Sequence, residues 1–141
     1  EFNFLIIDSE QVHVTDKVVE RVKKFKEENE NVFSELCSEE ERLITKALDS
    51  LKNNDLETIG KCIAQNQIYL EQIGVSNDIL LSILKEIEKI TFGAKITGAG
   101  DGGCIIALTE KDNDLSEYVN TTKYQTHQVS IQNTGIQVFN T

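Results

Sequence analysis

The sequence contains no proline, and only eight of its 141 residues are glycine. Prolines are the usual markers of linkers and domain boundaries, so nothing in this sequence suggests a point at which to divide the chain. At this length, one ordinary hydrophobic core is the default. We therefore expect a single domain over residues 1–141.

Basic residues are scarce as well. The chain has 14 lysines and arginines against 24 aspartates and glutamates, which gives a net charge of −10. Nucleic acids and anionic membranes require a basic face on their protein partners, so we expect neither as a partner. A small anionic substrate is compatible with this charge because a few backbone amides can bind an anion locally.

Long apolar runs and a signal-peptide pattern are also missing. No apolar stretch approaches the ~20 residues that a membrane span needs. The three cysteines, Cys37, Cys62 and Cys104, are odd in number and far apart, which favours buried, reduced thiols in a cytoplasmic protein. His13 and His127 lie in separate expected elements, so we expect no metal site.

Apolar residues spaced three and four apart predict a block of helices. Three helices are expected to be capped by Thr15, by the capping-box sequence 38–41 and by Asn54. A short helical piece is expected around Phe33, and a further helix is expected to start at 76–77. A polar break at 27–31 separates the helix at Thr15 from the piece around Phe33, and Gly74 is expected to end the helix that begins at Asn54. We expect the apolar stripe of every one of these helices to pack into the core.

Extended segments are expected at 2–7, 94–97 and 104–109, with two closing ones at 128–132 and 136–139 and a helix at 114–123. One strand thus precedes the helical block, and the others follow it. This segregation predicts the α+β class, with a mostly antiparallel four-stranded sheet and a helical bundle packed on one side.

A cluster of glycines lies between two of these strands: Gly93, Gly98, Gly100, Gly102 and Gly103. Such a cluster bends the backbone into conformations that other residues avoid, allows close packing, or offers consecutive amides to an anion. A plain tight turn is the simplest alternative, although two residues such as Asn-Gly suffice for one. Both interpretations stay open on these residues alone.

Gly98, Gly100 and Gly103 also satisfy the G-x-G-x-x-G pattern of dinucleotide-binding sites. That site needs a helix directly after the loop, because the helix N-terminus holds the pyrophosphate. Here the apolar run 104–108 follows, which is typical of a strand, so we reject this site. A Walker loop is excluded because no Lys-Ser or Lys-Thr pair closes the glycines.

The segment 95–104, KITGAGDGGC, closely resembles the third, C-terminal signature of the GHMP small-molecule kinases, and most closely that of the mevalonate kinases among them. The segment 66–76 is similar to the N-Q-x-x-L-x-x-x-G-V-S run that precedes this signature in mevalonate kinases. Two looser similarities extend the resemblance over the whole chain. They are the opening strand followed by the Thr15 helix, and the closing segment 128–138 with Gly135 in a turn.

This resemblance implies the C-terminal half of a two-domain kinase, with a ferredoxin-like core and with ATP and substrate in the cleft between the domains. The nucleotide-contacting residues that it implies are Thr97, Gly98, Ala99, Gly100, Asp101, Gly102 and Gly103. It implies no catalytic residue and no metal ligand in this chain. The family's ATP-binding sequence P-x-G-x-G-L-G-S-S does not occur here, so ATP and Mg²⁺ are expected to bind mainly to an N-terminal half.

The function that the resemblance implies is phosphoryl transfer from ATP to the hydroxyl of mevalonate, in isoprenoid biosynthesis. The alternatives are another GHMP kinase, acting on phosphomevalonate, homoserine or galactose, and a non-catalytic α+β binding module. The expected partners are the N-terminal half and the small substrate, with a homodimer left open. We expect the chain alone to bind ATP poorly and to catalyse no turnover.

Two residues depart from the family pattern. Asp101 stands where many members carry glycine; its carboxylate would repel a triphosphate, so we expect it to point away, or toward Mg²⁺ or a neighbouring amide. His13 stands where the pattern usually has arginine. Lys95 is either a positive charge near the loop or an exposed strand residue. Asn66 and Gln67 are expected to be buried with hydrogen bonds to a neighbouring loop, with substrate contact as the alternative.

Overall fold

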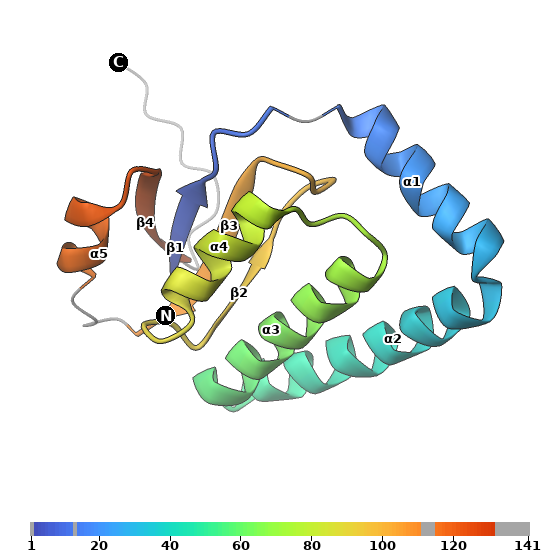
Figure 1. Ribbon diagram of the computed structural model, residues 1–141. Helices are drawn as coiled ribbons and strands as arrows, with labels where there is room; N and C mark the ends of the chain where they lie inside the picture. Colours follow the sequence, from blue (N-terminus) through green and yellow to red (C-terminus); the bar gives the residue numbers. More distant parts are fainter. Residues whose placement is uncertain (1, 13, 111–114, 132–141) are drawn as a thin grey trace, which may run out of the picture.

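The computed structural model describes residues 2–12, 14–110 and 115–131 (Figure 1). Its elements, in chain order, are β1 (Phe2–Asp8), α1 (Thr15–Glu28), α2 (Glu30–Lys52), α3 (Leu56–Gln72), α4 (Asp78–Ile87), β2 (Gly93–Ile96), β3 (Cys104–Thr109), α5 (Ser116–Thr121) and β4 (Gln125–Ile131). The expected strand at 136–139 lies outside the described residues.

The four strands form one sheet in the order β2-β3-β1-β4, and every neighbouring pair is antiparallel. The helices α1 to α4 connect β1 to β2, and α5 connects β3 to β4. This is the β-α-β-β-α-β arrangement of ferredoxin-like folds, with an enlarged first helical connection. The predicted α+β class with an antiparallel four-stranded sheet is confirmed.

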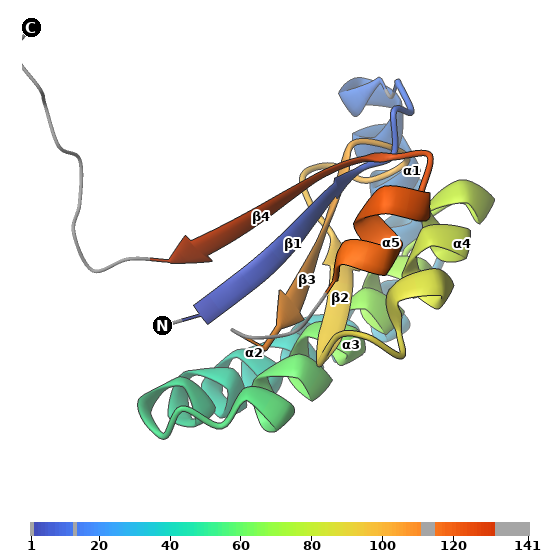
Figure 2. The ribbon, with the colours of Figure 1, turned by 90° about the vertical axis from the view of Figure 1, so that its left-hand side faces the viewer.

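The hydrophobic core lies between one face of the sheet and α4. Leu5 and Ile7 of β1 point to this face, as do Ile105 and Ala107 of β3, and all four are fully buried. From α4 the core receives Leu80, Ile83 and Ile87. Figure 2 shows α4 and α5 on this face.

The helix α3 lies against the outer edge of β2, where two glycines bring the backbones together. A Cβ at Gly93 would lie 2.0 Å from the carbonyl oxygen of Gly60, and one at Gly60 would lie 2.3 Å from that of Phe92. The side-chain oxygen of Gln67 accepts a hydrogen bond of 2.9 Å from the amide of Ile96. The edge of the sheet is therefore covered, and one of its free amides is satisfied by a side chain.

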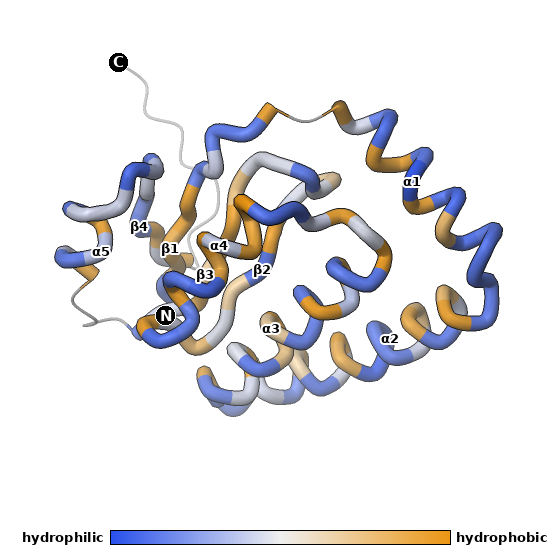
Figure 3. Tube along the Cα trace, viewed as in Figure 1, coloured by the Kyte–Doolittle hydropathy of each residue, from blue (hydrophilic) through white to orange (hydrophobic). Residues whose placement is uncertain are grey.

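The helices α1 and α2 extend away from the sheet (Figure 1), and their apolar stripes are only partly buried. In Figure 3, hydrophobic residues gather on β1, β3 and α4. On α1 and α2, hydrophobic residues alternate with hydrophilic ones. Of the apolar residues of α1 only Val18 is buried, and α2 has none. Ile44, Leu48 and Leu51 are each at least 40% exposed. The prediction that every stripe packs into the core is wrong for α2, and for α1 it holds only for Val18 and Val22.

Several element boundaries differ from the prediction. One continuous helix, α2, replaces the expected break at 38, because the hydroxyl of Ser38 donates to the carbonyl of Ser34 inside the helix. Asp55, not Asn54, caps α3 by accepting from the amide of Thr58. Thr15 is the first residue of α1 rather than its cap. The expected start of α4 at 76–77 is confirmed, with Asn77 as its cap. The strand β4 begins at Gln125, three residues earlier than predicted.

No helix in the described part of the chain is long and apolar enough to cross a membrane. The three cysteines are free, but only Cys62 is buried, and Cys104 is half-buried. Cys37 on α2 is exposed, so the prediction of burial is wrong there.

Candidate functional site

The glycine-rich segment forms the turn between β2 and β3, beside the connection from α3 to α4 (Figure 1). Thr97 closes the turn: its amide donates to the carbonyl of Cys104 at 2.9 Å, and its hydroxyl donates to the same oxygen at 3.2 Å. A strand, not a helix, begins at Cys104. This geometry agrees with the rejection of a dinucleotide fingerprint.

The backbone of this turn occupies conformations that favour glycine. Five residues have a positive φ, at 71° for Gly98, 88° for Gly100, 59° for Asp101, 158° for Gly102 and 75° for Gly103. Ordinary side chains are strained in this region, which explains why glycine is repeated here. Asp101 is the one exception, and its side chain is held from two directions as described below.

Two of the glycines press the turn against neighbouring backbone, and one faces open space. A Cβ at Gly100 would lie 2.2 Å from the carbonyl oxygen of Val75, and one at Gly102 would lie 2.5 Å from that of Gln11. A Cβ at Gly98 would meet no atom within 4 Å. The turn is therefore anchored on one side and open on the other.

The amide groups of the turn divide in a similar way. The amide of Asp101 donates to the carbonyl of Val75 at 2.7 Å, and that of Gly103 donates to the carbonyl of Gln11 at 3.3 Å. Among the described residues, no acceptor is found for the amides of four others: Gly98, Ala99, Gly100 and Gly102. Unpaired amides in a glycine-rich turn form a concavity that suits an anion such as a phosphate.

The carboxylate of Asp101 is held by one side chain of α1 and one of the connection from α3 to α4. It accepts a hydrogen bond of 2.9 Å from the guanidinium of Arg21 on α1, and one of 3.5 Å from the side-chain amide of Asn77. The same guanidinium donates to the carbonyl of Gly74 at 2.9 Å. Sequence reasoning missed Arg21. Its signal is weak, since it is only a charged residue three positions after Val18, near the inner face of α1.

Ser76 adds a polar group next to this network. It lies between Val75, whose carbonyl accepts from the turn, and Asn77, whose side chain contacts Asp101. Its hydroxyl is buried and has no hydrogen-bond partner among the described residues. A buried hydroxyl of this kind is a ready contact for a polar ligand group.

An apolar groove of about 330 Å³ borders the turn on the side of α1. Its walls are Val18, Val19 and Val22 of α1 together with Ala99 of the turn, and two lysines, Lys23 and Lys26, complete the lining. The turn thus has a hydrophobic neighbour with positive charge close by.

Three polar residues lie where α3 packs against β2. They are Asn66 and Gln67 of α3 and Lys95 of β2. Burial lowers the pKa of Lys95, and the nearby Glu40 carboxylate partly opposes this shift. Asn66 donates to the Glu40 carboxylate at 2.7 Å, and Gln67, 4% exposed, binds the amide of Ile96. Lys95 is therefore partly buried, beside Glu40 and Asn66, rather than freely exposed. The partner of Gln67 is a strand edge rather than the expected loop.

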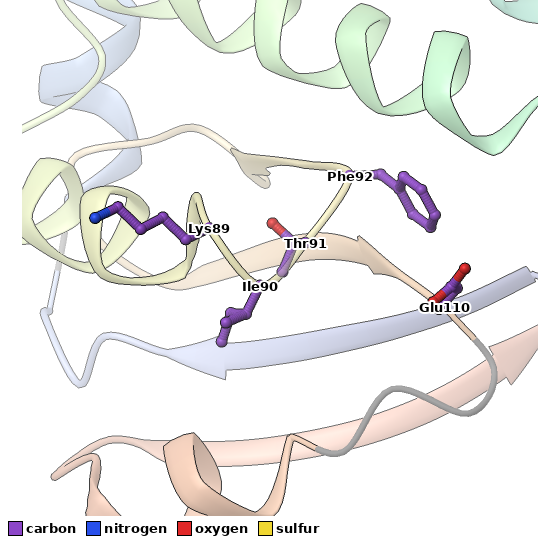
Figure 4. A pocket seen from close by; sticks show the side chains of 5 residues that line it. All are labelled: Lys89, Ile90, Thr91, Phe92 and Glu110. Carbon is purple, nitrogen blue, oxygen red and sulfur yellow. The ribbon is translucent and has the colours of Figure 1, made fainter.

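Another hollow, of about 280 Å³, lies at the opposite end of the sheet (Figure 4). Its lining residues are Lys89, Ile90, Thr91, Phe92 and Glu110. In Figure 4 their side chains point apart rather than toward a common centre, so no ligand chemistry is assembled there.

In the ranges 2–12, 14–110 and 115–131, no three His, Cys, Asp or Glu side chains gather as a metal ion would require. The predicted departure at His13 lies outside those ranges. The structure brings Thr97 to Gly103 together in one turn, as a site would need. Their contact with a nucleotide stays a prediction.

Comparison with known proteins identifies relatives of the chain. A family model described as "GHMP kinases C terminal" matches residues 47–122. The chain is 30% identical over 118 residues to a mevalonate kinase of Archaeoglobus fulgidus, covering 84% of this chain and 40% of that protein. It is 38% identical over 82 residues to a galactokinase of Clostridium acetobutylicum, covering 55% of this chain and 21% of that protein.

Among solved structures, the chain is similar to L. major mevalonate kinase in complex with R-mevalonate. The TM-score is 0.82 at 24% identity, over 91% of this chain and 42% of that one. At this identity the similarity shows the fold. The chain spans two fifths or less of the length of the two curated relatives described above.

Proposed function

Because the chain belongs to the GHMP kinase family, through the family's C-terminal domain, we propose that it is the C-terminal part of an ATP-dependent kinase that phosphorylates mevalonate. One observation carries the proposal: a strand-to-strand turn of glycines whose amides at Gly98, Ala99, Gly100 and Gly102 have no acceptor within the described residues. Such a turn is suited to the negative charge of a nucleotide's phosphates.

The residues of this chain would act by binding and positioning. Bound ATP would supply the transferred phosphoryl group, with Mg²⁺ neutralising part of its charge. The free amides of the turn would face the phosphates, and the close contacts of Gly100 with Val75 and of Gly102 with Gln11 would hold those amides in place. Positioning of this kind supplies much of the catalysis in phosphoryl transfer, because little acid-base chemistry is needed.

An N-terminal half of the same kinase is the partner that this proposal requires. It would bind ATP and Mg²⁺ through a glycine-rich loop and supply the acidic residue that orients the substrate hydroxyl. The turn at Thr97 to Gly103 would border the cleft between the halves. The three free cysteines support a reducing compartment, and we place the kinase in the cytoplasm.

Mevalonate is favoured over other substrates by the residues 66–76, which follow the mevalonate kinase pattern, and by the similarity to mevalonate kinases over most of this chain. The galactokinase similarity covers only 55% of the chain. Phosphomevalonate and homoserine remain the other candidate acceptors.

The test is an ADP-release assay on the polypeptide that carries this chain together with its N-terminal half, with mevalonate, phosphomevalonate, homoserine and galactose supplied in parallel. We expect mevalonate to give the highest kcat/KM. A higher value with any other acceptor would reassign the substrate, and ATP turnover with none of them would contradict the kinase function. The 141-residue chain alone should show no turnover, and mixing it with a separately produced N-terminal half should restore some.

A further inference from the structure

Asp101 is an unusual residue for the position that it occupies. It has a φ of 59° and is the only residue other than glycine with a positive φ between 95 and 104. It also places a carboxylate in a turn whose free amides suit an anion. A residue that is strained and carries the wrong charge persists only where its surroundings compensate for both.

Arg21 supplies that compensation from α1, 80 positions away in the sequence. One of its terminal nitrogens lies 2.9 Å from the Asp101 carboxylate, and the other donates to the carbonyl of Gly74 at 2.9 Å. The guanidinium therefore joins three segments, namely α1, the connection from α3 to α4, and the glycine turn. Both side chains are partly exposed, at 45% for Arg21 and 31% for Asp101.

The backbone contacts of the turn depend on the same region. The amide of Asp101 donates to the carbonyl of Val75, and Gly100 lies against that carbonyl. Asn77 contacts the other carboxylate oxygen of Asp101 at 3.5 Å. Side chain and backbone of Asp101 are thus both fixed to the segment 74–77.

We propose that Arg21 is a positioning residue for the anion-binding turn. Its guanidinium holds and neutralises the Asp101 carboxylate, so that this carboxylate neither repels the phosphates nor turns toward the free amides of the turn. The identity of the bound anion rests on the proposed kinase function; the coupling between Arg21 and the turn does not.

The charge relation predicts an asymmetric pattern of effects. Arg21→Gln leaves the Asp101 carboxylate uncompensated, so the KM for ATP rises about three- to tenfold, with a smaller change in kcat. Asp101→Gly removes the carboxylate and relieves the backbone strain, so the KM changes less than twofold. The double variant has no charge left to compensate and recovers most of the loss. A merely structural ion pair would make the double variant no better than Arg21→Gln.

The assay uses the polypeptide that carries this chain with its N-terminal half, and steady-state kinetics with ATP varied. The matched control is Lys24→Gln, which breaks an exposed ion pair with Glu28 at 3.7 Å on the same helix and should leave the KM unchanged. Recovery in the Arg21→Gln/Asp101→Gly variant supports the proposal. An Arg21→Gln variant with the wild-type KM, or a double variant as impaired as Arg21→Gln, overturns it.

A second measurement separates this proposal from the kinase function. In ¹⁵N–¹H spectra of the 141-residue chain without nucleotide, Arg21→Gln should shift the amide signals of Gly98, Gly100 and Gly102, whereas Lys24→Gln should not. If no variant turns over ATP but these signals move, the proposed function fails and the positioning role stands. Signals that stay unchanged in Arg21→Gln contradict the positioning role, whatever the kinase assay shows.

Discussion

Glycines bring two backbones together at two places in this domain, and the two contacts differ in what they leave free. Where α3 meets the edge of β2, a Cβ added at Gly60 or at Gly93 would lie 2.3 Å or less from a carbonyl oxygen, so both glycines are closed in. In the turn between β2 and β3, Gly100 and Gly102 are closed in, whereas Gly98 meets nothing within 4 Å.

The difference separates glycines that serve packing from glycines that would serve recognition under the proposed function. At the α3–β2 contact, the backbone amide of Ile96 donates its hydrogen bond to the side chain of Gln67. In the turn, four amides have no acceptor within the described residues. The α3–β2 contact is thus closed by packing and by a hydrogen bond, whereas the turn keeps amides that a ligand could use.

The largest expected effect comes from closing the packing contact. Gly93→Ala places a methyl group 2.0 Å from the carbonyl oxygen of Gly60, with helix backbone that cannot move aside. We expect the free energy of unfolding to fall by about 3 kcal/mol, measured by urea denaturation. A loss below about 1 kcal/mol would mean that α3 and β2 are not held at this distance.

Gly100→Ala tests the anchored side of the turn. Its methyl group would lie 2.2 Å from the carbonyl oxygen of Val75, and the φ of 88° adds strain. Because the turn can shift more easily than a helix, we expect a loss of about 2 kcal/mol in the free energy of unfolding. The same variant should lose kinase activity in the longer polypeptide. Full kinase activity together with reduced stability would show that the turn is not part of the functional site.

Gln67→Leu tests the side-chain acceptor at the packing contact. The variant leaves the buried amide of Ile96 without a partner, which should cost about 1–2 kcal/mol of unfolding free energy. Gln72→Leu at the exposed end of the same helix is the matched control and should change stability by less than about 0.5 kcal/mol. Equal effects of the two substitutions would show that the hydrogen bond contributes nothing.

Gly98→Ala tests the open side of the turn. The methyl group has room, so only the φ of 71° opposes it, at about 1 kcal/mol. Stability should therefore change little, whereas kcat/KM for ATP should fall about tenfold or more because the methyl group occupies the ligand side. An unchanged kcat/KM would show that phosphates do not approach Gly98.

The smallest expected effect is a pH-dependent change in the free energy of unfolding that comes from the partly buried Lys95. Burial lowers its pKa in the folded chain below the ordinary value of 10.5, so the unfolded chain binds the proton more tightly. Stability of the wild type relative to Lys95→Met should therefore rise as the pH increases toward 10.5, by less than about 0.5 kcal/mol. Thermal unfolding of both proteins between pH 7 and that value measures it. A relative stability that falls over this window would contradict the burial of Lys95.

The sheet and its turn could be predicted from the sequence because their signals are local. The apolar runs 2–7 and 104–109, and the glycines between β2 and β3, define strands and turn without reference to distant residues. The break at Ser38 was wrong because a serine hydroxyl caps a helix and also bonds inside one with similar ease. Asn54 and Asp55 offer equivalent capping side chains, and only the backbone of the folded turn selects between them.

The long-range contacts beside the turn and at the edge of β2 could not be predicted from the sequence. Arg21 meets Asp101 across 80 positions, and Gln67 meets Ile96 across 29. Neither pairing leaves a periodic or compositional trace, because each depends on how α1 and α3 lie against the sheet. The burial of the helical stripes was overestimated for the same reason, since periodicity marks an apolar face but does not say what covers it.

The most direct test of the central claim is the response of the backbone amides to nucleotide. In ¹⁵N–¹H spectra of the polypeptide that carries this chain with its N-terminal half, Mg·ATP should shift the signals of Gly98, Ala99, Gly100 and Gly102 and leave those of Gly60 and Gly93 in place. If nucleotide binds and the four turn signals do not move, the turn is a structural hairpin and the phosphate-binding role assigned to it is wrong.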